Sequence, residues 1–78
     1  MRYTVKASFP NAKDFEKVKD RPIKSVIERA VGNRCTVLEI SDLPPIFVCT
    51  STHSAESIQK IIGDTVPGLI FVTIKTLE

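Results

Sequence analysis

The residues best suited to chemistry lie within one segment, residues 46–56, which reads IFVCTSTHSAE. In a nucleophilic Cys–His pair the imidazole lies within hydrogen-bonding distance of the thiol, and a third group orients it. Cys49 and His53 are separated by the end of an expected strand and a turn, so no regular geometry brings them together. A metal site needs three or four ligands, and the other candidates are Glu56 and the distant Cys35. The sequence therefore predicts neither a catalytic pair nor a metal site in this segment.

The hydroxyl groups of the same segment indicate the start of a helix. Ser51, Thr52 and Ser54 offer oxygens that can accept from the free N–H groups of a first helical turn, with Ser54 as the expected N-cap. Glu56 would lie in that first turn, where a negative charge suits the helix dipole. We therefore interpret the segment as a strand end followed by the cap of a helix over residues 54–63.

Other signatures of catalysis or of cofactor binding do not occur in the sequence. The chain has three glycines, and they form neither a GxGxxG pattern nor another glycine-rich phosphate loop. Cys35 and Cys49 lie in patterns typical of strand interiors, where a small thiol packs as an apolar group, and we expect them to stay reduced. The sequence predicts a protein that is not an enzyme and that binds no cofactor.

Four segments have the pattern of strands. In residues 2–9, RYTVKASF, apolar and polar side chains alternate, which indicates a strand with one buried face formed by Tyr3, Val5, Ala7 and Phe9. Further strands are expected over residues 34–40, 46–51 and 69–77. The short connection between the second and third strands makes them antiparallel neighbours.

A helix precedes the second strand. Pro22 is acceptable only in a first helical turn, so we expect a helix over about residues 21–31. Asp20 would be its N-cap, and Gly32-Asn33 would end it. Residues 12–19 are interpreted as a separate short turn of helix.

These elements follow one another in the order β-α-β-β-α-β. The economical packing is a ferredoxin-like α+β sandwich, in which a four-stranded antiparallel sheet of order 4-1-3-2 carries two helices on one face. The whole chain, residues 1–78, forms a single domain, and residues 77–78 resemble the remnant of an expression tag. The other face of the sheet would be left uncovered.

The composition is that of an ordinary globular protein, with 42% apolar residues, 26% charged residues and a net charge of +2. No apolar run is long enough to span a membrane and no signal peptide is expected, so we predict a cytoplasmic protein without a membrane partner. Charge is uneven along the chain. Residues 1–34 hold nine basic and four acidic side chains, whereas residues 35–78 hold two basic and five acidic ones.

The uncovered sheet face is the expected binding surface. Taking Ile70, Val72 and Ile74 to face the helices places Leu69 and Phe71 on the open side of the sheet. The third strand would add either Ile46 and Val48 or Phe47 and Cys49. An exposed apolar patch of a few hundred Å² often marks an interface. The residues predicted to bind a partner are Phe47, Leu69 and Phe71.

Basic residues of the first half would support this contact. We expect a protein partner or a second copy of the chain to bind the open face, with the basic residues directing an acidic surface towards it. The alternative is a nucleic-acid binder that resembles the RNA-recognition motif, which has this topology and stacks bases on aromatic side chains of its sheet. Phe47 or Phe71 would supply such a side chain. The predicted basic patch contains Arg2, Lys6, Lys13, Lys17, Lys19, Arg21, Lys24 and Lys75.

Overall fold

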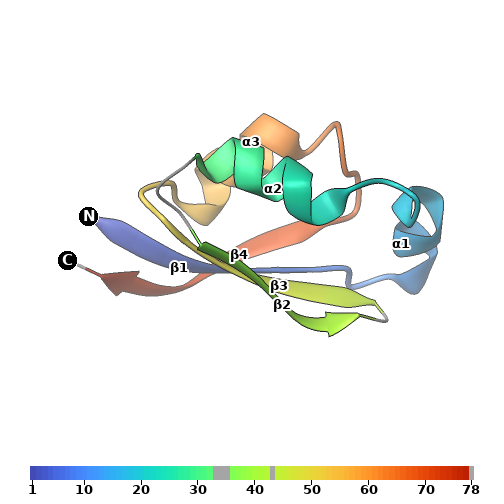
Figure 1. The fold of residues 1–78 in the computed structure, drawn as a ribbon, viewed down its shortest axis with the longest axis horizontal. Coiled ribbons are helices and arrows are strands. Elements are labelled where there is room, and N and C mark those ends of the chain that lie inside the picture. The colour runs from blue at the N-terminus through green and yellow to red at the C-terminus, as the bar shows by residue number, and fades with distance from the viewer. Residues whose placement is uncertain (33–35, 43, 78) are drawn as a thin grey trace.

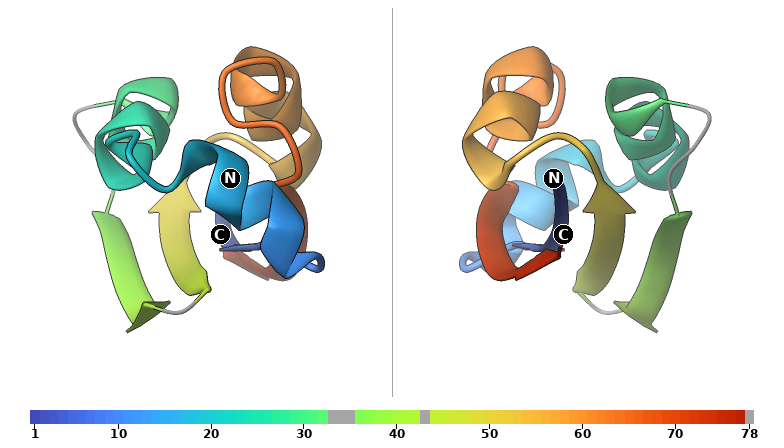
Figure 2. Two further views of the ribbon diagram at one scale, coloured as in Figure 1. Left: turned by 90° about the vertical axis from the view of Figure 1, so that its right-hand side faces the viewer. Right: turned by 90° about the vertical axis from the view of Figure 1, so that its left-hand side faces the viewer.

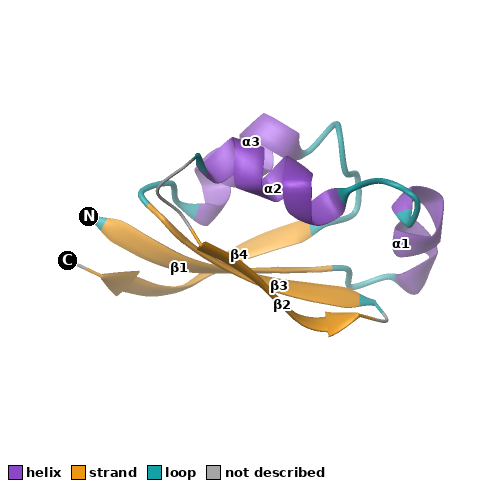
Figure 3. Ribbon diagram, in the orientation of Figure 1, coloured by secondary structure: helices purple, strands orange, loops and turns teal. Residues whose placement is uncertain are grey.

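The computed structural model describes residues 1–32, 36–42 and 44–77, which form four strands and three helices (Figure 1). Figure 3 distinguishes the strands, the helices and the loops that connect them. Their bounds are β1 Arg2–Ser8, α1 Ala12–Val18, α2 Ile23–Val31, β2 Thr36–Asp42, β3 Pro45–Ser51, α3 Ala55–Ile62 and β4 Ile70–Leu77.

The four strands form one antiparallel sheet of order β2-β3-β1-β4, so β2 and β4 are its edges. Helices α2 and α3 lie side by side over one face of the sheet, as the end-on views in Figure 2 show. Helix α1 lies beyond the end of the sheet at which β1 ends (Figure 1). No helix covers the other face in these views, and we call that side of the sheet the open face.

The expected ferredoxin-like βαββαβ sandwich with two helices is wrong, because the described chain is interleaved as β-α-α-β-β-α-β and has three helices. The expected strand order 4-1-3-2 is the observed order read from the β4 edge. The additional helix is α1, which the sequence analysis counted only as a short turn. Its start is capped by Asn11, whose side chain accepts from the backbone N–H of Lys13 at 2.9 Å. Its last residue, Val18, is buried in the core. A local cap and one buried anchor therefore stabilise a seven-residue helix.

Pro22 separates α1 from α2. Proline has no N–H and disfavours helical backbone in the residue before it, so a helix cannot continue through this position. Pro22 is itself the N-cap of α2, and its carbonyl accepts the first helical bond, from the backbone N–H of Val26. The expected Asp20 cap is therefore wrong, and α2 begins without a side-chain cap. Gly32 ends α2 with φ of +86°, a conformation that glycine adopts without strain. Asn33 lies outside the described residues.

The core lies between the sheet and the two helices. Val5 and Ala7 of β1 are fully buried at its centre, as the alternation in residues 2–9 predicted. Ile27 of α2 and Ile58 of α3 are also fully buried, and they pack against the sheet from the two helices. Cys49 belongs to the same cluster, while Cys35 lies outside the described residues. The apolar face of each element is thus turned inward.

The connection between α3 and β4 also fixes the position of α1. Gly68 has φ of +90°, and a Cβ at this residue would lie 2.4 Å from the Cβ of Asp14 in α1. The backbone of the loop therefore contacts α1 more closely than any residue with a side chain would allow.

Candidate functional site

The three side chains predicted to bind a partner lie in the core. Phe47 is 2% exposed, Leu69 is not exposed, and Phe71 is 7% exposed. The prediction that Leu69 and Phe71 point to the open face is wrong, and in β3 the residues on the open side are Ile46 and Val48 rather than Phe47 and Cys49. These three side chains belong to the hydrophobic core.

Polar contacts join α3 to β4 and to the residue before it. The side-chain amide of Gln59 donates to the carbonyl oxygen of Leu69 at 3.0 Å and accepts from the backbone N–H of Phe71 at 3.1 Å. The hydroxyl oxygen of Thr73 accepts from the backbone N–H of Ala55, the first residue of α3, at 3.1 Å. Leu69 and Phe71 are buried and the hydroxyl of Thr73 bonds the start of α3, so by alternation Ile70 and Val72 lie on the open face.

The open face carries two aliphatic strips separated by β1. One strip contains Leu38, Ile46 and Val48, and the other contains Ile70 and Val72. The register places Lys6 between Val48 and Val72, and it places Ser8 between Ile46 and Ile70. Leu38 lies opposite Val48 on the outer side of the first strip. We use the name aliphatic strips for these five residues.

The outer members of the strips are well exposed: Leu38 is 57% exposed, Ile70 43% and Val72 52%. Ile46 and Val48, on the central strand β3, are half-buried. Each edge strand also has an irregularity, which leaves Ile40 of β2 and Ile74 of β4 without a place in the register. Such β-bulges twist an edge strand and are a common protection against pairing with another chain.

Three basic residues share the open face with the strips. Arg2 and Lys6 follow its alternation in β1, and Lys75 lies opposite Thr4. Glu39 lies opposite the buried Phe47 and therefore belongs to the helix side. Among the strand residues whose side chains are described, the open face thus carries positive charge and no acidic group.

The other predicted basic residues lie on or beside α1 and α2. Lys13 and Lys17 are exposed on α1, and Lys24 is exposed in the first turn of α2. The predicted basic patch is therefore two separate groups, one on the open face and one around the first two helices.

Two of the helical cations already have partners within the chain. Lys19 pairs with Glu16 at 3.1 Å, and the hydrogen bond and negative charge of that carboxylate raise the pKa of Lys19 above its ordinary value. Arg21 donates to the carbonyl oxygen of Thr65 in the loop before β4. Arg21 thus joins the connection between α1 and α2 to the loop before β4.

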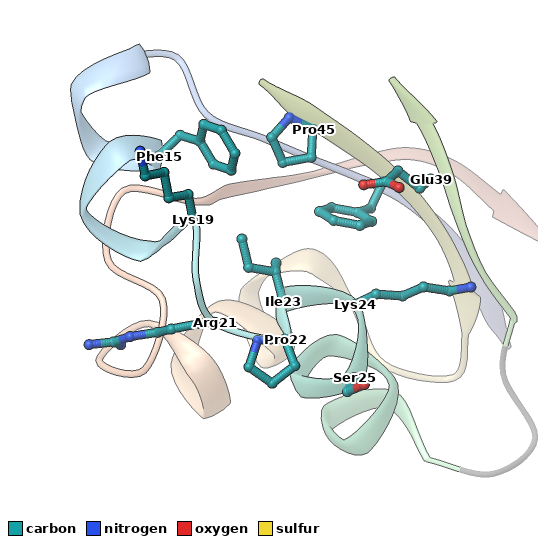
Figure 4. A pocket seen from close by; sticks show the side chains of 10 residues that line it. Phe15, Lys19, Arg21, Pro22, Ile23, Lys24, Ser25, Glu39 and Pro45 are labelled. Atoms are coloured by element: carbon teal, nitrogen blue, oxygen red, sulfur yellow. The ribbon is translucent and has the colours of Figure 1, made fainter. Parts of the chain in front are cut away.

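A hollow of about 270 Å³ lies between the first two helices and the edge of the sheet (Figure 4). Apolar side chains line its floor and charged ones its rim, and Figure 4 shows Ile23 pointing towards Phe15 and Pro45. In the same view Arg21 and Lys24 extend away from the hollow in opposite directions. Glu39 lies on the rim as well. Three basic residues, Lys19, Arg21 and Lys24, therefore line the hollow together with one acidic residue, and Lys19 and Arg21 are bonded within the chain.

The segment that suggested chemistry has a structural role, as predicted. The hydroxyl of Ser54 caps α3 by accepting from the backbone N–H of Ser57. The hydroxyl of Ser51 accepts from the backbone N–H of His53 at 3.0 Å and donates to the carbonyl oxygen of the same residue at 3.1 Å. These bonds close the turn between β3 and α3.

Comparisons with protein-family models, with curated proteins and with solved structures found no match for this chain. Within the described residues, no three side chains among His, Cys, Asp and Glu are grouped so that they could hold a metal ion. A search of the same residues found no helix with the length and apolar character that a membrane span requires. The candidate site is therefore assigned from its geometry and charge alone.

The exposure of Ile70 and Val72 on the open face was not expected from the sequence. Ile70 and Val72 were expected to be buried because both alternating sets of β4 are rich in large apolar side chains. The signal that distinguishes the two sets is Thr73, a polar residue whose hydroxyl can bond the start of a helix. The place of that helix is a tertiary feature, so the distinction required the three-dimensional arrangement.

Proposed function

We propose that this chain is a non-enzymatic protein-interaction module that binds a partner protein through the open face. One observation carries the proposal. Seven large apolar side chains of the described residues are exposed, and five of them belong to the edge strands β2 and β4, namely Leu38, Ile40, Ile70, Val72 and Ile74. Exposed aliphatic residues concentrated on a sheet are a usual mark of an interface.

The magnitude of this apolar contribution indicates the kind of complex. Complete burial of one exposed Val, Leu or Ile side chain contributes roughly 1.5–3 kcal/mol, so a half-exposed one contributes about 1 kcal/mol. Five such side chains together contribute on the order of 5 kcal/mol. Association itself costs roughly 4–15 kcal/mol, so the aliphatic contacts alone support only a weak complex. A specific partner must add polar contacts.

The aromatic residues on which the nucleic-acid alternative depended are not exposed on the open face. Stacking of bases needs aromatic rings on the binding surface. Phe47 and Phe71 are buried, and Tyr3 lies opposite Ser51 on the helix side of the sheet. The strand residues whose side chains are described thus place no aromatic ring on the open face.

A pair of lysine substitutions tests the proposal. Val72→Lys places a charge in one aliphatic strip, while Ile61→Lys places the same charge at an equally exposed site on α3, since the two residues are 52% and 53% exposed. The immobilised wild type and both variants, each verified as folded by thermal unfolding, are incubated with lysate of the source cells. Bound proteins are then quantified by mass spectrometry.

We expect a set of proteins that the wild type and Ile61→Lys retain equally and that Val72→Lys loses. Identical retention by all three chains would show that the open face has no part in binding. Loss of binding in both variants would point to a general effect of added charge and would also count against the proposal.

A further inference from the structure

The charges on the open face specify the chemistry of its partner. Lys6 lies between Val48 and Val72, so an occupant that covers both aliphatic strips must also cover the ammonium group of Lys6. A cation that is covered without a counter-charge is costly, whereas a carboxylate opposite it gives a charge-assisted hydrogen bond. Arg2 and Lys75 add positive charge farther along β1 and β4.

We propose that the open face binds a protein surface that combines aliphatic side chains with Asp or Glu, and that one of these carboxylates pairs with Lys6. This inference rests on the proposed function and narrows it to one class of partner. The aliphatic side chains of the partner cover the strips, and the acidic ones match the three basic residues of the face. The polar contacts that a specific complex requires are then supplied by these charge pairs.

A second copy of the chain does not meet this requirement. Packing two open faces centrally against each other brings Lys6 of one copy close to Lys6 of the other. The described side chains of the face provide no carboxylate to separate them. Like charges that are placed together and shielded from water disfavour such a dimer. The charge pattern thus favours a different protein over self-association.

Two other anionic partners fit less well. Nucleic acid supplies the negative charge, but it has little aliphatic surface to cover the strips, and the face offers no ring for base stacking. An anionic membrane supplies negative charge in its headgroup layer and aliphatic surface in its hydrocarbon layer, so the two are separated in depth. Because Lys6 lies between the strips, insertion of both strips into the hydrocarbon region would carry its ammonium group with them, which is unfavourable. A protein surface can place a carboxylate and an aliphatic group side by side.

Selection of peptides tests this chemistry without knowledge of the natural partner. A phage-displayed library of random peptides is selected on the immobilised wild-type chain after removal of every phage that binds Val72→Lys. We expect the selected peptides to be enriched in Asp and Glu adjacent to Ile, Leu or Val. Binding of a selected synthetic peptide is then measured by calorimetry with the wild type, Lys6→Gln and Ile61→Lys.

Lys6→Gln removes the charge of Lys6 and keeps a polar side chain, so it should weaken the peptide by about 10-fold or more, the effect of one lost charge-assisted hydrogen bond. Added salt should weaken the wild-type complex more than that of Lys6→Gln. Ile61→Lys should bind as the wild type does.

Several results would overturn the inference. Face-dependent peptides that lack acidic residues and bind Lys6→Gln unchanged would refute the acidic partner and leave the proposed function standing. A wild-type dimer in analytical ultracentrifugation that Val72→Lys dissociates would assign the face to a second copy. If no acidic peptides were selected and the chain bound phosphatidylserine vesicles or oligo-dT in a way that depends on Val72, the open face would be assigned to a lipid surface or to nucleic acid. Absence of any binding that depends on Val72 would remove both this inference and the proposed function.

Discussion

Replacing Gln59 should reduce stability and loosen the start of β4. The side-chain amide of Gln59 makes two hydrogen bonds to the backbone of β4 and its approach, at 3.0 Å to the oxygen of Leu69 and 3.1 Å from the nitrogen of Phe71. Gln59→Leu keeps a side chain of similar size and removes both bonds. One intramolecular hydrogen bond contributes about 1 kcal/mol net, and a polar group left without a partner raises the cost.

We therefore expect the free energy of unfolding to fall by about 2 kcal/mol. For a chain of this length the total is only about 4–12 kcal/mol, and the midpoint of thermal unfolding should fall by roughly 8–16 °C. Urea titration followed by circular dichroism measures the first quantity, and calorimetry measures the second. Hydrogen exchange should show the backbone amide of Phe71 losing protection relative to that of Val5 in the central strand.

Lys60→Leu is the matched control, because it introduces the same side chain at the next, exposed position of α3. It should change the unfolding free energy by less than about 0.5 kcal/mol. If Gln59→Leu were as stable as the wild type and the amide of Phe71 kept its protection, the two hydrogen bonds of Gln59 would not hold the start of β4 to α3, and the prediction would be refuted.

Two further pairs of substitutions test the packing. Gly68→Ala should lower the free energy of unfolding by about 3 kcal/mol, because it combines a positive φ with a Cβ that would lie 2.4 Å from the Cβ of Asp14. Gly32→Ala should cost only about 1–2 kcal/mol, because Gly32 has a similar φ but open space around it. Equal losses in urea titrations would show that the contact with Asp14 does not matter. Ile58→Ala should cost about 3–4 kcal/mol because that side chain is fully buried, while Ile61→Ala on the exposed side of the same helix should cost less than about 1 kcal/mol. A similar cost for both alanines would contradict the assigned face of α3.

Local sequence patterns predicted the features that local interactions determine. The alternation in residues 2–9 predicted the buried face of β1, because a strand with one covered face requires a period of two. Ser54 was recognised as the cap of α3, since a serine that precedes an apolar helical pattern can satisfy a free N–H group within the same turn. Both signals lie within a few residues of the structure that they specify.

The features that were predicted only in part or wrongly depend on contacts between distant residues. Residues 12–19 indicated no more than a short turn of helix, because seven residues are too few to be stable alone and the burial of Val18 that holds α1 to the core is a tertiary contact. The face of β4 was assigned wrongly because both of its alternating sets are apolar, and the contact of Thr73 with the start of α3 that distinguishes them is also tertiary.

The candidate site was predicted in part. Arg2, Lys6 and Lys75 were named as basic residues and lie on the open face. Their aliphatic neighbours could not be identified from the sequence, because two orientations of β3 were considered and the predicted orientation of β4 was wrong. Which side chains surround Lys6 depends on the register of three strands, and no short stretch of sequence contains that information.

The contact between Gln59 and β4 has a consequence for the limits of the sheet. A side-chain amide carries the same donor and acceptor as a peptide group, and here it satisfies one outward-pointing N–H and one outward-pointing C=O, as a residue of a fifth strand would. The glutamine thus takes the place of a neighbouring strand at the start of β4. A strand from another chain that pairs along β4 must displace this amide before it can extend past Phe71, so a single side chain limits how far the sheet can be extended at this edge.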